Sequence, residues 1–191
     1  MNTLYPIFLK LNQLHVLIVG GGEVGLEKIS FMLKSSPDAQ ITLVAPQILP
    51  EIYKVAEAHE KVRLLKRNYL SDDLNGKDLV IAATEKPELN VRIYADARKK
   101  HLLINVADTP DLCDFYMGSV VTKGDLKIGI STNGKSPTFA KRFRQVLEEI
   151  LPDDISALLQ NLHEIRNQLK GNFIHKVNEL NKITADLVNK A

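Results

Sequence analysis

An apolar run that ends in a cluster of glycines is the feature that most constrains how this chain can fold. Residues 14–19 are rich in apolar and β-branched types and predict a strand buried on both faces. Gly20, Gly22 and Gly25 then fit the pattern G-x-G-x-x-G. Apolar residues at roughly helical spacing follow: Val24, Ile29, Met32 and Leu33. A glycine turn between a strand and a helix is typical of a dinucleotide-binding fold.

Each glycine of this pattern has an expected physical role. The first allows a tight turn, the second lets the backbone approach a pyrophosphate, and the third lets helix and strand pack closely. Free N–H groups at the start of the helix attract the anion. A tight turn with no ligand is the alternative at this point, because any glycine-rich turn can match so short a pattern.

The second expected strand lacks one residue that such folds usually have. Residues 40–45 form an apolar run that ends in Ala45-Pro46, where an Asp or Glu commonly binds the ribose hydroxyls. We therefore expect the adenosine end of the cofactor to be held differently. This position does not distinguish NAD from NADP.

The chain alternates strands and helices as far as residue 106. The first helix should end near Ser35, and Tyr5 to Leu11 should be an edge strand or a cover over the first turn. The remaining expected elements are a helix at 50–59, a strand at 62–67, a strand at 78–84, a helix at 86–99 and a strand at 102–106. The alternation predicts an α/β fold with a Rossmann-type, doubly wound parallel sheet. Its ligands should bind at the carboxyl ends of the strands, along the glycine turn, Ala45-Pro46, Ala83-Thr84 and residues 105–108.

The pattern changes after Pro110. Residues 119–131 read as a hairpin, which cannot extend a parallel sheet by the usual crossover and therefore predicts a separate small module. A helix should follow from Pro137 to Leu151, with Ser136 as its N-cap. Residues 155–190 read as two helices around Gly171. Their apolar stripe is expected to be core or a subunit contact: Ile155, Leu158, Leu159, Leu162, Ile165 and Leu169.

Composition excludes several classes of protein. The 25 basic and 23 acidic residues give a net charge of +2, which predicts no nucleic-acid binding. The single cysteine, Cys113, excludes an internal disulfide and is expected to be a small buried hydrophobe. The five histidines are scattered without metal-site spacing, so no metal site is expected. Without a signal sequence or a long apolar segment, the chain is expected to be cytoplasmic, with no membrane association.

Four local patterns occur together in this order: 19–24 (VGGGEV), 82–84 (AAT), 105–110 (NVADTP) and 131–137 (STNGKSP). As an ordered set they resemble the precorrin-2 dehydrogenase family. That family includes the amino-terminal module of bacterial sirohaem synthase, the stand-alone bacterial dehydrogenases and the bifunctional fungal dehydrogenase/ferrochelatase. The resemblance spans nearly the whole chain and is weakest over residues 155–191.

The resemblance implies NAD-dependent oxidation of precorrin-2, a tetrapyrrole, to sirohydrochlorin on the way to sirohaem. It also implies a homodimer in which the small β-module and the helical region contact the partner. The corresponding division is an NAD-binding domain at 1–112, a dimerisation and substrate-binding module at 113–150 and a helical region at 151–191. Two departures are Met117-Gly118, where many relatives carry a proline, and the lack of a carboxy-terminal methyltransferase domain, so that the preceding methylations are not expected.

The resemblance also assigns residues. Asp108 matches the aspartate with a catalytic role. The expected cofactor-binding residues are Gly20, Gly21, Gly22, Glu23, Val24, Gly25, Pro46, Gln47, Ala83, Thr84, Asn105 and Val106. A substrate with many carboxylates requires basic groups and free N–H donors. The expected substrate-binding residues are therefore Ser131, Thr132, Asn133, Gly134, Lys135, Ser136 and Arg144, with Lys141 and Arg142 as further candidates.

Asp108 follows the last parallel strand, where a nicotinamide ring would reach, so it is a candidate base or electrostatic partner. The alternative is an Asx turn leading into Thr109-Pro110. Iron insertion is a possible second activity, which the scattered histidines do not favour. Two alternatives for the whole chain stay open: a nucleotide-sensing regulatory module, and another oxidoreductase on the same fold.

Overall fold

The structure is a computed structural model that describes residues 2–185. It divides the chain into two compact units, Met1–Met117 and Gly118–Ala191. The division into segments 1–112, 113–150 and 151–191 stays a prediction.

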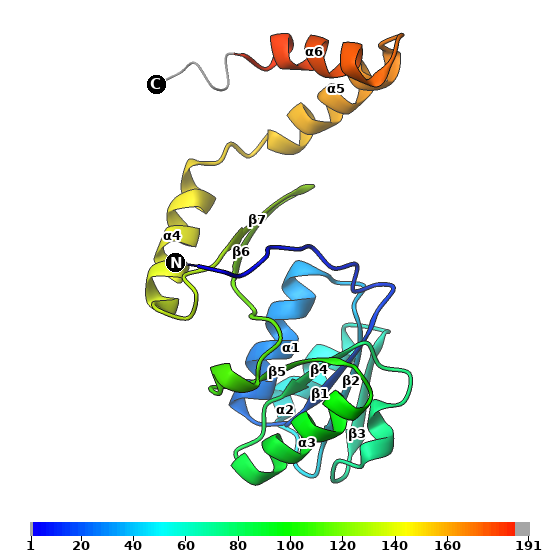
Figure 1. Cartoon of the computed structure of the whole chain (residues 1–191), viewed down its shortest axis with the longest axis vertical. Helices are drawn as coiled ribbons and strands as arrows, with labels where there is room; N and C mark the ends of the chain where they lie inside the picture. The colour runs from blue at the N-terminus through cyan, green and yellow to red at the C-terminus, as the bar shows by residue number, and fades with distance from the viewer. Residues whose placement is uncertain (1, 186–191) are drawn as a thin grey trace. The chain divides into compact units, whose positions relative to one another are not determined.

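The first unit is built on a five-stranded parallel sheet with the order β3-β2-β1-β4-β5 (Figure 1). This confirms the predicted Rossmann-type α/β fold. The strands are β1 (His15–Val19), β2 (Gln40–Ala45), β3 (Val62–Lys66), β4 (Leu79–Ala82) and β5 (Leu103–Val106). The helices are α1 (Glu23–Ser35), α2 (Pro50–Glu57) and α3 (Pro87–Lys99), with two short 3-10 helices, η1 (Ser71–Leu74) and η2 (Pro110–Leu112).

The two faces of the sheet bury two separate apolar clusters, which makes it doubly wound. Alternate residues of β1 point to opposite faces, so Val16 and Ile18 join one cluster while Leu17 and Val19 join the other. The first cluster includes Ile29 of α1 and Ile52 of α2. The second includes Ile93 and Ala97 of α3 and Leu74 of η1. Burial on both faces explains why the strands read as nearly continuous apolar runs.

The lead-in at residues 5–11 is not an edge strand, so that alternative is wrong. The edges of the sheet are β3 and β5, whereas β1 lies at its centre. Tyr5 and Phe8 are 87% and 70% exposed. The segment is tied to the sheet only at its end, where Gln40 N donates to Leu11 O at 3.1 Å and Leu11 packs against the first cluster.

Over residues 118–185, the second unit holds an antiparallel hairpin and three helices. The strands are β6 (Ser119–Lys123) and β7 (Leu126–Ile130), and the helices are α4 (Pro137–Ile150), α5 (Ile155–Gln168) and α6 (Phe173–Ile183). Ser136 caps α4 as expected, since its Oγ accepts from Phe139 N at 3.1 Å. Gly171, with φ +112°, separates α5 from α6. The last predicted helical residues, 186–190, lie outside the described residues.

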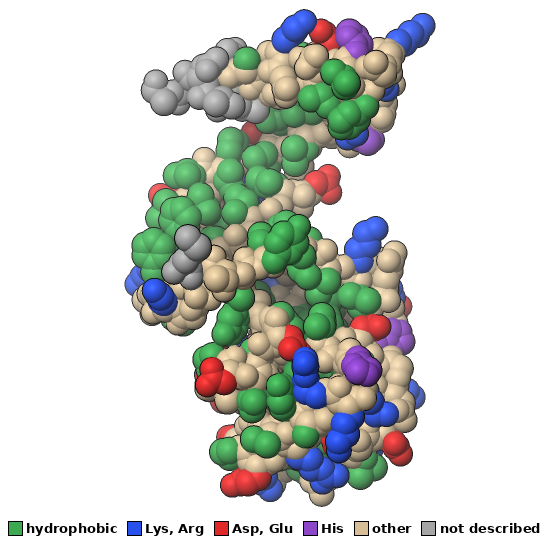
Figure 2. Space-filling view, in the orientation of Figure 1, with side chains coloured by type: hydrophobic (Ala, Val, Ile, Leu, Met, Phe, Trp, Pro, Cys, Tyr) green, Lys and Arg blue, Asp and Glu red, His purple; other side chains and the backbone are tan. Residues whose placement is uncertain are grey.

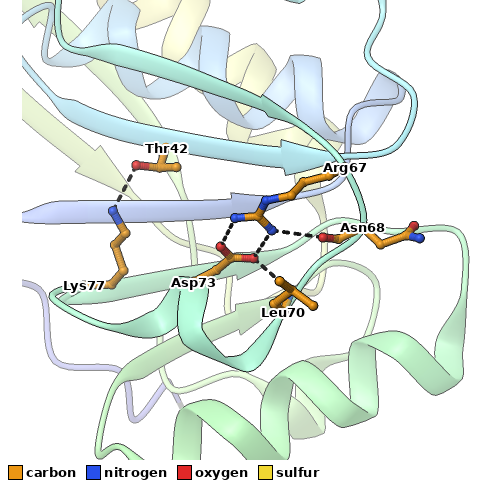
Figure 3. Close-up of polar contacts among 6 residues, drawn as sticks. All are labelled: Thr42, Arg67, Asn68, Leu70, Asp73 and Lys77. Atoms are coloured by element: carbon orange, nitrogen blue, oxygen red, sulfur yellow. Dashed lines mark hydrogen bonds and ion pairs between the residues drawn. The ribbon is translucent and has the colours of Figure 1, made fainter.

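A polar cluster fastens the edge of the first unit's sheet to η1 (Figure 3). Arg67 follows β3, and its guanidinium makes two hydrogen bonds to the carboxylate of Asp73, whose side chain is only 7% exposed. Leu70 N also donates to Asp73 Oδ2 at 2.9 Å. Burial opposes ionisation of Asp73, but the hydrogen bonds from Arg67 and Leu70 outweigh it and lower the pKa of this carboxyl.

Replacing Asp73 with alanine should therefore destabilise the chain by about 1–3 kcal/mol at pH 7, because the half-buried Arg67 and the N–H of Leu70 lose their hydrogen bonds to a charged acceptor. A lowered folded-state pKa adds stability above the carboxyl's ordinary pKa of about 3.9 and loses it as the pH falls through the folded value. Urea unfolding at pH 7 and below pH 4 measures both effects, with the exposed Asp72→Ala as control. Equal stabilities of the Asp73→Ala and parent proteins at pH 7 would show that the cluster contributes nothing.

Candidate functional site

Three buried glycines shape the turn between β1 and α1. Gly20 has φ +131°, and a Cβ built on it would lie 2.1 Å from Ala83 O, so only glycine fits beside the end of β4. A Cβ on Gly25 would lie 2.2 Å from Gly20 O, which is the close packing of helix and strand expected for the third glycine. A Cβ on Gly21 would lie 2.3 Å from Gln47 O. The sequence pattern did not assign a role to Gly21.

Gly22 differs from these three glycines. It is half-buried, and the nearest atom to a built Cβ is Glu85 Oε1 at 3.9 Å. Gly22 is also the N-cap residue of α1 and has no side chain that could cap the helix, while Glu23 and Val24 begin its first turn. Space is therefore open above the start of a helix whose N–H groups favour an anion.

The end of β4 is held by a residue that the sequence analysis missed. Asn90 of α3 is buried, and its Oδ1 accepts from Thr84 Oγ1 at 2.7 Å while its Nδ2 donates to Thr84 O at 3.0 Å. Asn90 lies three and seven residues before Ile93 and Ala97, so its place on the buried face of α3 could have been read from the helical period. Pro46 and Gln47 lie exposed beyond β2.

Asp108 lies in a tight turn after β5. Its φ is +56°, a left-handed conformation that Asp tolerates better than most residues. Thr109 N donates to Val106 O at 3.2 Å, and Thr109 Oγ1 donates to Ala107 O at 3.3 Å. The carboxylate of Asp108 is exposed and has no hydrogen bond or ion pair within residues 2–185, so the expected alternative of an Asx turn is wrong.

Asn105 and Val106, expected to bind the cofactor, make internal contacts. Asn105 is 7% exposed, and its Nδ2 donates to Phe115 O at 2.8 Å. Val106 N donates to Cys113 Sγ at 3.3 Å. Cys113 is half-buried and packs against the second apolar cluster, as expected of a small hydrophobe, and its sulfur also makes hydrogen bonds. Asp114 accepts from Arg98 and from Ile104 N, which gives it a structural role.

The expected substrate-binding residues lie in the second unit. Asn133 (φ +54°) and Gly134 (φ +74°) form a left-handed turn between β7 and α4. Thr132 closes that turn, since its carbonyl accepts from Lys135 N at 3.1 Å and its Oγ1 accepts from Ser136 N at 3.2 Å. Asn133 N donates to Ser131 Oγ at 3.2 Å, and Lys135 is exposed.

Charge on α4 is partly neutralised within the helix. Arg144 Nη1 lies 2.6 Å from Glu148 Oε1, an i, i+4 ion pair that the helical spacing could have predicted. Arg142 Nη1 donates to Gln145 Oε1 at 3.2 Å. Two exposed lysines lie in or near the turn at residues 131–136. Lys135 belongs to the turn, and Lys141 lies five residues beyond it.

An apolar stripe runs along the other side of α4. Phe139 and Phe143 stack with ring centroids 5.9 Å apart, and the stripe continues through Val146 to Ile150. Phe139 is 58% and Ile150 is 65% exposed. Figure 2 shows hydrophobic side chains gathered over this helix. The predicted stripe from Ile155 to Leu169 is not core within this chain either, because all of its side chains are at least partly exposed.

Residues 2–185 contain no group of three or more His, Cys, Asp and Glu side chains that could hold a metal ion. His15 opens β1 and His101 precedes β5, both at the end of the sheet opposite the glycine turn. Among the described residues, no helix is long and apolar enough to cross a membrane.

Comparison with known proteins finds two family models. Residues 7–119 match the model described as putative NAD(P)-binding, and residues 123–150 match the model described as sirohaem biosynthesis protein central. The chain is 38% identical over 171 residues to a siroheme synthase of Psychrobacter sp. strain PRwf-1, which covers 90% of this chain and 34% of that protein. It is 33% identical over 173 residues to a siroheme synthase of Nitrosomonas europaea, covering 91% of this chain and 36% of that protein.

The chain thus spans about a third of the length of the curated relatives it matches. Among solved structures, SirC, a precorrin-2 dehydrogenase, superposes with a TM-score of 0.72 at 28% identity. The superposition covers 94% of this chain and 89% of that one. The likeness therefore extends over both compact units.

Proposed function

Because this chain belongs to the family of precorrin-2 dehydrogenases and sirohaem synthase amino-terminal modules, we propose that it oxidises precorrin-2 to sirohydrochlorin with NAD. Its first unit is an NAD(P)-binding domain. The observation that carries the proposal is the open space over Gly22, at the rim that also bears the carboxylate of Asp108, which has no partner among residues 2–185. Ligands of such sheets bind where the strand order reverses, here between β1 and β4.

The residues around the glycine turn fit a dinucleotide. Gly22 and the start of α1 would hold the pyrophosphate, because three neighbouring glycines bring the backbone close and the helix N–H groups face the anion. Pro46 and Gln47 would contact the adenosine end. Ala83 and Thr84, held in place by Asn90, would line the rim beside the nicotinamide end. When bound, NAD supplies the acceptor for the hydride.

Asp108 would accept the proton that the substrate loses. Oxidation of the substrate removes a hydride and a proton, and the carboxylate of Asp108 is an acceptor with no internal partner among residues 2–185. Its exposed position at the end of β5 lets it reach a substrate that lies against the rim. Asn105 and Val106 would hold the backbone of this turn in place through their hydrogen bonds to Phe115 O and Cys113 Sγ.

The second unit would bind the carboxylates of the substrate. The turn at 131–136 and the capped start of α4 would present N–H groups, and the exposed Lys135 would add charge. Arg144 would contribute through the part of its guanidinium that Glu148 does not engage.

The experiment that tests this function is an anaerobic assay with enzymatically generated precorrin-2 and either NAD or NADP. The formation of NADH at 340 nm should accompany the appearance of sirohydrochlorin. A repeat with Fe²⁺ or Co²⁺ tests metal insertion against the rate without enzyme. NAD binding without turnover would refute the proposal and favour a regulatory module or an oxidoreductase with another substrate.

We also propose that the protein is a homodimer and that the apolar stripe of α4 lies in its interface. Four apolar side chains on one helical face are costly to leave in water, and a second copy would cover them. Phe143→Glu should convert the dimer to a monomer in light scattering after gel filtration. Lys141→Glu, on the opposite face of α4, is the matched control. A Phe143→Glu protein that stays dimeric would place the interface elsewhere.

A further inference from the structure

The segment that follows the Asp108 turn folds back along the free edge of β5. Asp114 N donates to Ile104 O at 2.8 Å, and Asp114 Oδ2 accepts from Ile104 N at 3.0 Å. Asn105 Nδ2 donates to Phe115 O at 2.8 Å. Residues 107–112 therefore form a loop whose two ends are bonded together, with Asp108 near its start.

The sulfur of Cys113 lies inside this closed loop. Cys113 Sγ accepts from Val106 N at 3.3 Å and lies 3.2 Å from Val106 O and 3.3 Å from Thr109 O. It also accepts from Asn105 Nδ2 at 3.4 Å. The thiol thus contacts the backbone on both sides of Asp108.

The thiol is suited to this position because it both accepts and donates. β5 is an edge strand of the sheet that the described residues form, so on the side away from β4 Val106 N donates to the sulfur of Cys113. Burial raises the pKa of the Cys113 thiol, despite the N–H of Val106, which favours the thiolate. The proton is therefore retained and can be donated to one of the two carbonyls, Val106 O or Thr109 O.

Asp108 itself depends on this support. Its backbone is left-handed, and its carboxylate has no partner within residues 2–185, so the place of the carboxylate is set by the backbone bonds around it. We propose that Cys113 is a positioning residue for Asp108: its thiol clamps Val106 and Thr109 and thereby aims the Asp108 carboxylate at the rim. The proposal rests on the function proposed above.

The test compares Cys113→Val, which removes donor and acceptor at similar size, with Cys113→Ser, which keeps both. We expect Cys113→Val to lower kcat by about tenfold or more, because small misplacements of a catalytic group are costly, with KM for NAD little changed. Cys113→Ser should recover most of the loss. Leu112→Val, a neighbouring partly buried apolar residue, is the packing control. All assays are run well below each variant's melting temperature.

Two further measurements separate positioning from simple destabilisation. In an Asp108→Asn background, Cys113→Val should cause no further fall in kcat, because the group being positioned is gone. Amide hydrogen exchange of Val106 should be at least about tenfold faster in Cys113→Val than in the parent, and near the parent rate in Cys113→Ser.

The outcomes are distinguishable. A parent protein that does not turn over precorrin-2 refutes the proposed function. Amide hydrogen exchange of Val106 then still tests whether Cys113 Sγ holds Val106 N. A parent that turns over, with kcat unchanged in Cys113→Val, refutes the positioning role. An equal further loss of kcat in the Asp108→Asn background also refutes it.

Discussion

Asp108→Asn should lower kcat for precorrin-2 oxidation by a factor of about 10² to 10⁴, the usual contribution of a positioned general acid or base. The loss should fall on kcat and hardly on KM for NAD, because the glycine turn that would hold the cofactor lies on β1 and α1. Asparagine is the sharper substitution, because it tolerates the left-handed φ of +56° at this position. Alanine would add backbone strain of roughly 1–2 kcal/mol, so that the loss of the carboxylate and the strain could not be separated.

Asp111→Asn is the matched control for this prediction. Asp111 is an exposed carboxylate in η2, three residues further along the same loop. Steady-state rates with saturating NAD, together with NAD titrations of both variants, give the comparison. Full turnover by Asp108→Asn would remove Asp108 from the chemistry. A parallel loss in Asp111→Asn would point to the charge of the loop as a whole.

The parallel sheet could be predicted almost entirely from the sequence. Strands buried on both faces leave apolar runs, and helices with one buried face leave a period near 3.6, so β2 and α3 were found within a residue of their bounds. The lead-in at residues 5–11 was ambiguous because an apolar run alone does not say whether a strand partner exists. The segment has no strand partner in the described sheet, because the next strand along the chain, β1, lies at the centre between β2 and β4.

The candidate site could be predicted where backbone geometry demands a residue type. The roles of Gly20 and Gly25 follow from a tight turn and a close helix, and the structure has both contacts. The close approach of Gly21 to Gln47 O, which leaves no room for a Cβ, joins residues far apart in sequence, so no local pattern predicts it. The polar contacts of Cys113 were missed for the same reason, because they exist only once the loop has closed on β5.

Gly22→Ala should weaken cofactor binding with little effect on stability, whereas Gly25→Ala should destabilise the fold. Gly22 has an ordinary extended φ of −89° and open space where a methyl group would lie, so Gly22→Ala should change the free energy of unfolding by no more than about 1 kcal/mol, the cost of a weaker N-cap residue. The methyl group would occupy the space proposed for the pyrophosphate. Overpacking of about 1–3 kcal/mol would weaken NAD binding by roughly 5- to 150-fold.

Gly25→Ala should instead destabilise the protein itself. Its methyl carbon would lie 2.2 Å from Gly20 O and 2.9 Å from Gly20 C, backbone atoms that cannot move without distorting the turn. We expect a loss of at least about 1–3 kcal/mol, which lowers the melting temperature by several degrees. Thermal unfolding of both variants with and without NAD, with calorimetric titration, separates the effects. Parent-like NAD affinity in Gly22→Ala would mean that the cofactor lies elsewhere, because, among the described residues beyond its two chain neighbours, the nearest atom to the added methyl group is Glu85 Oε1 at 3.9 Å.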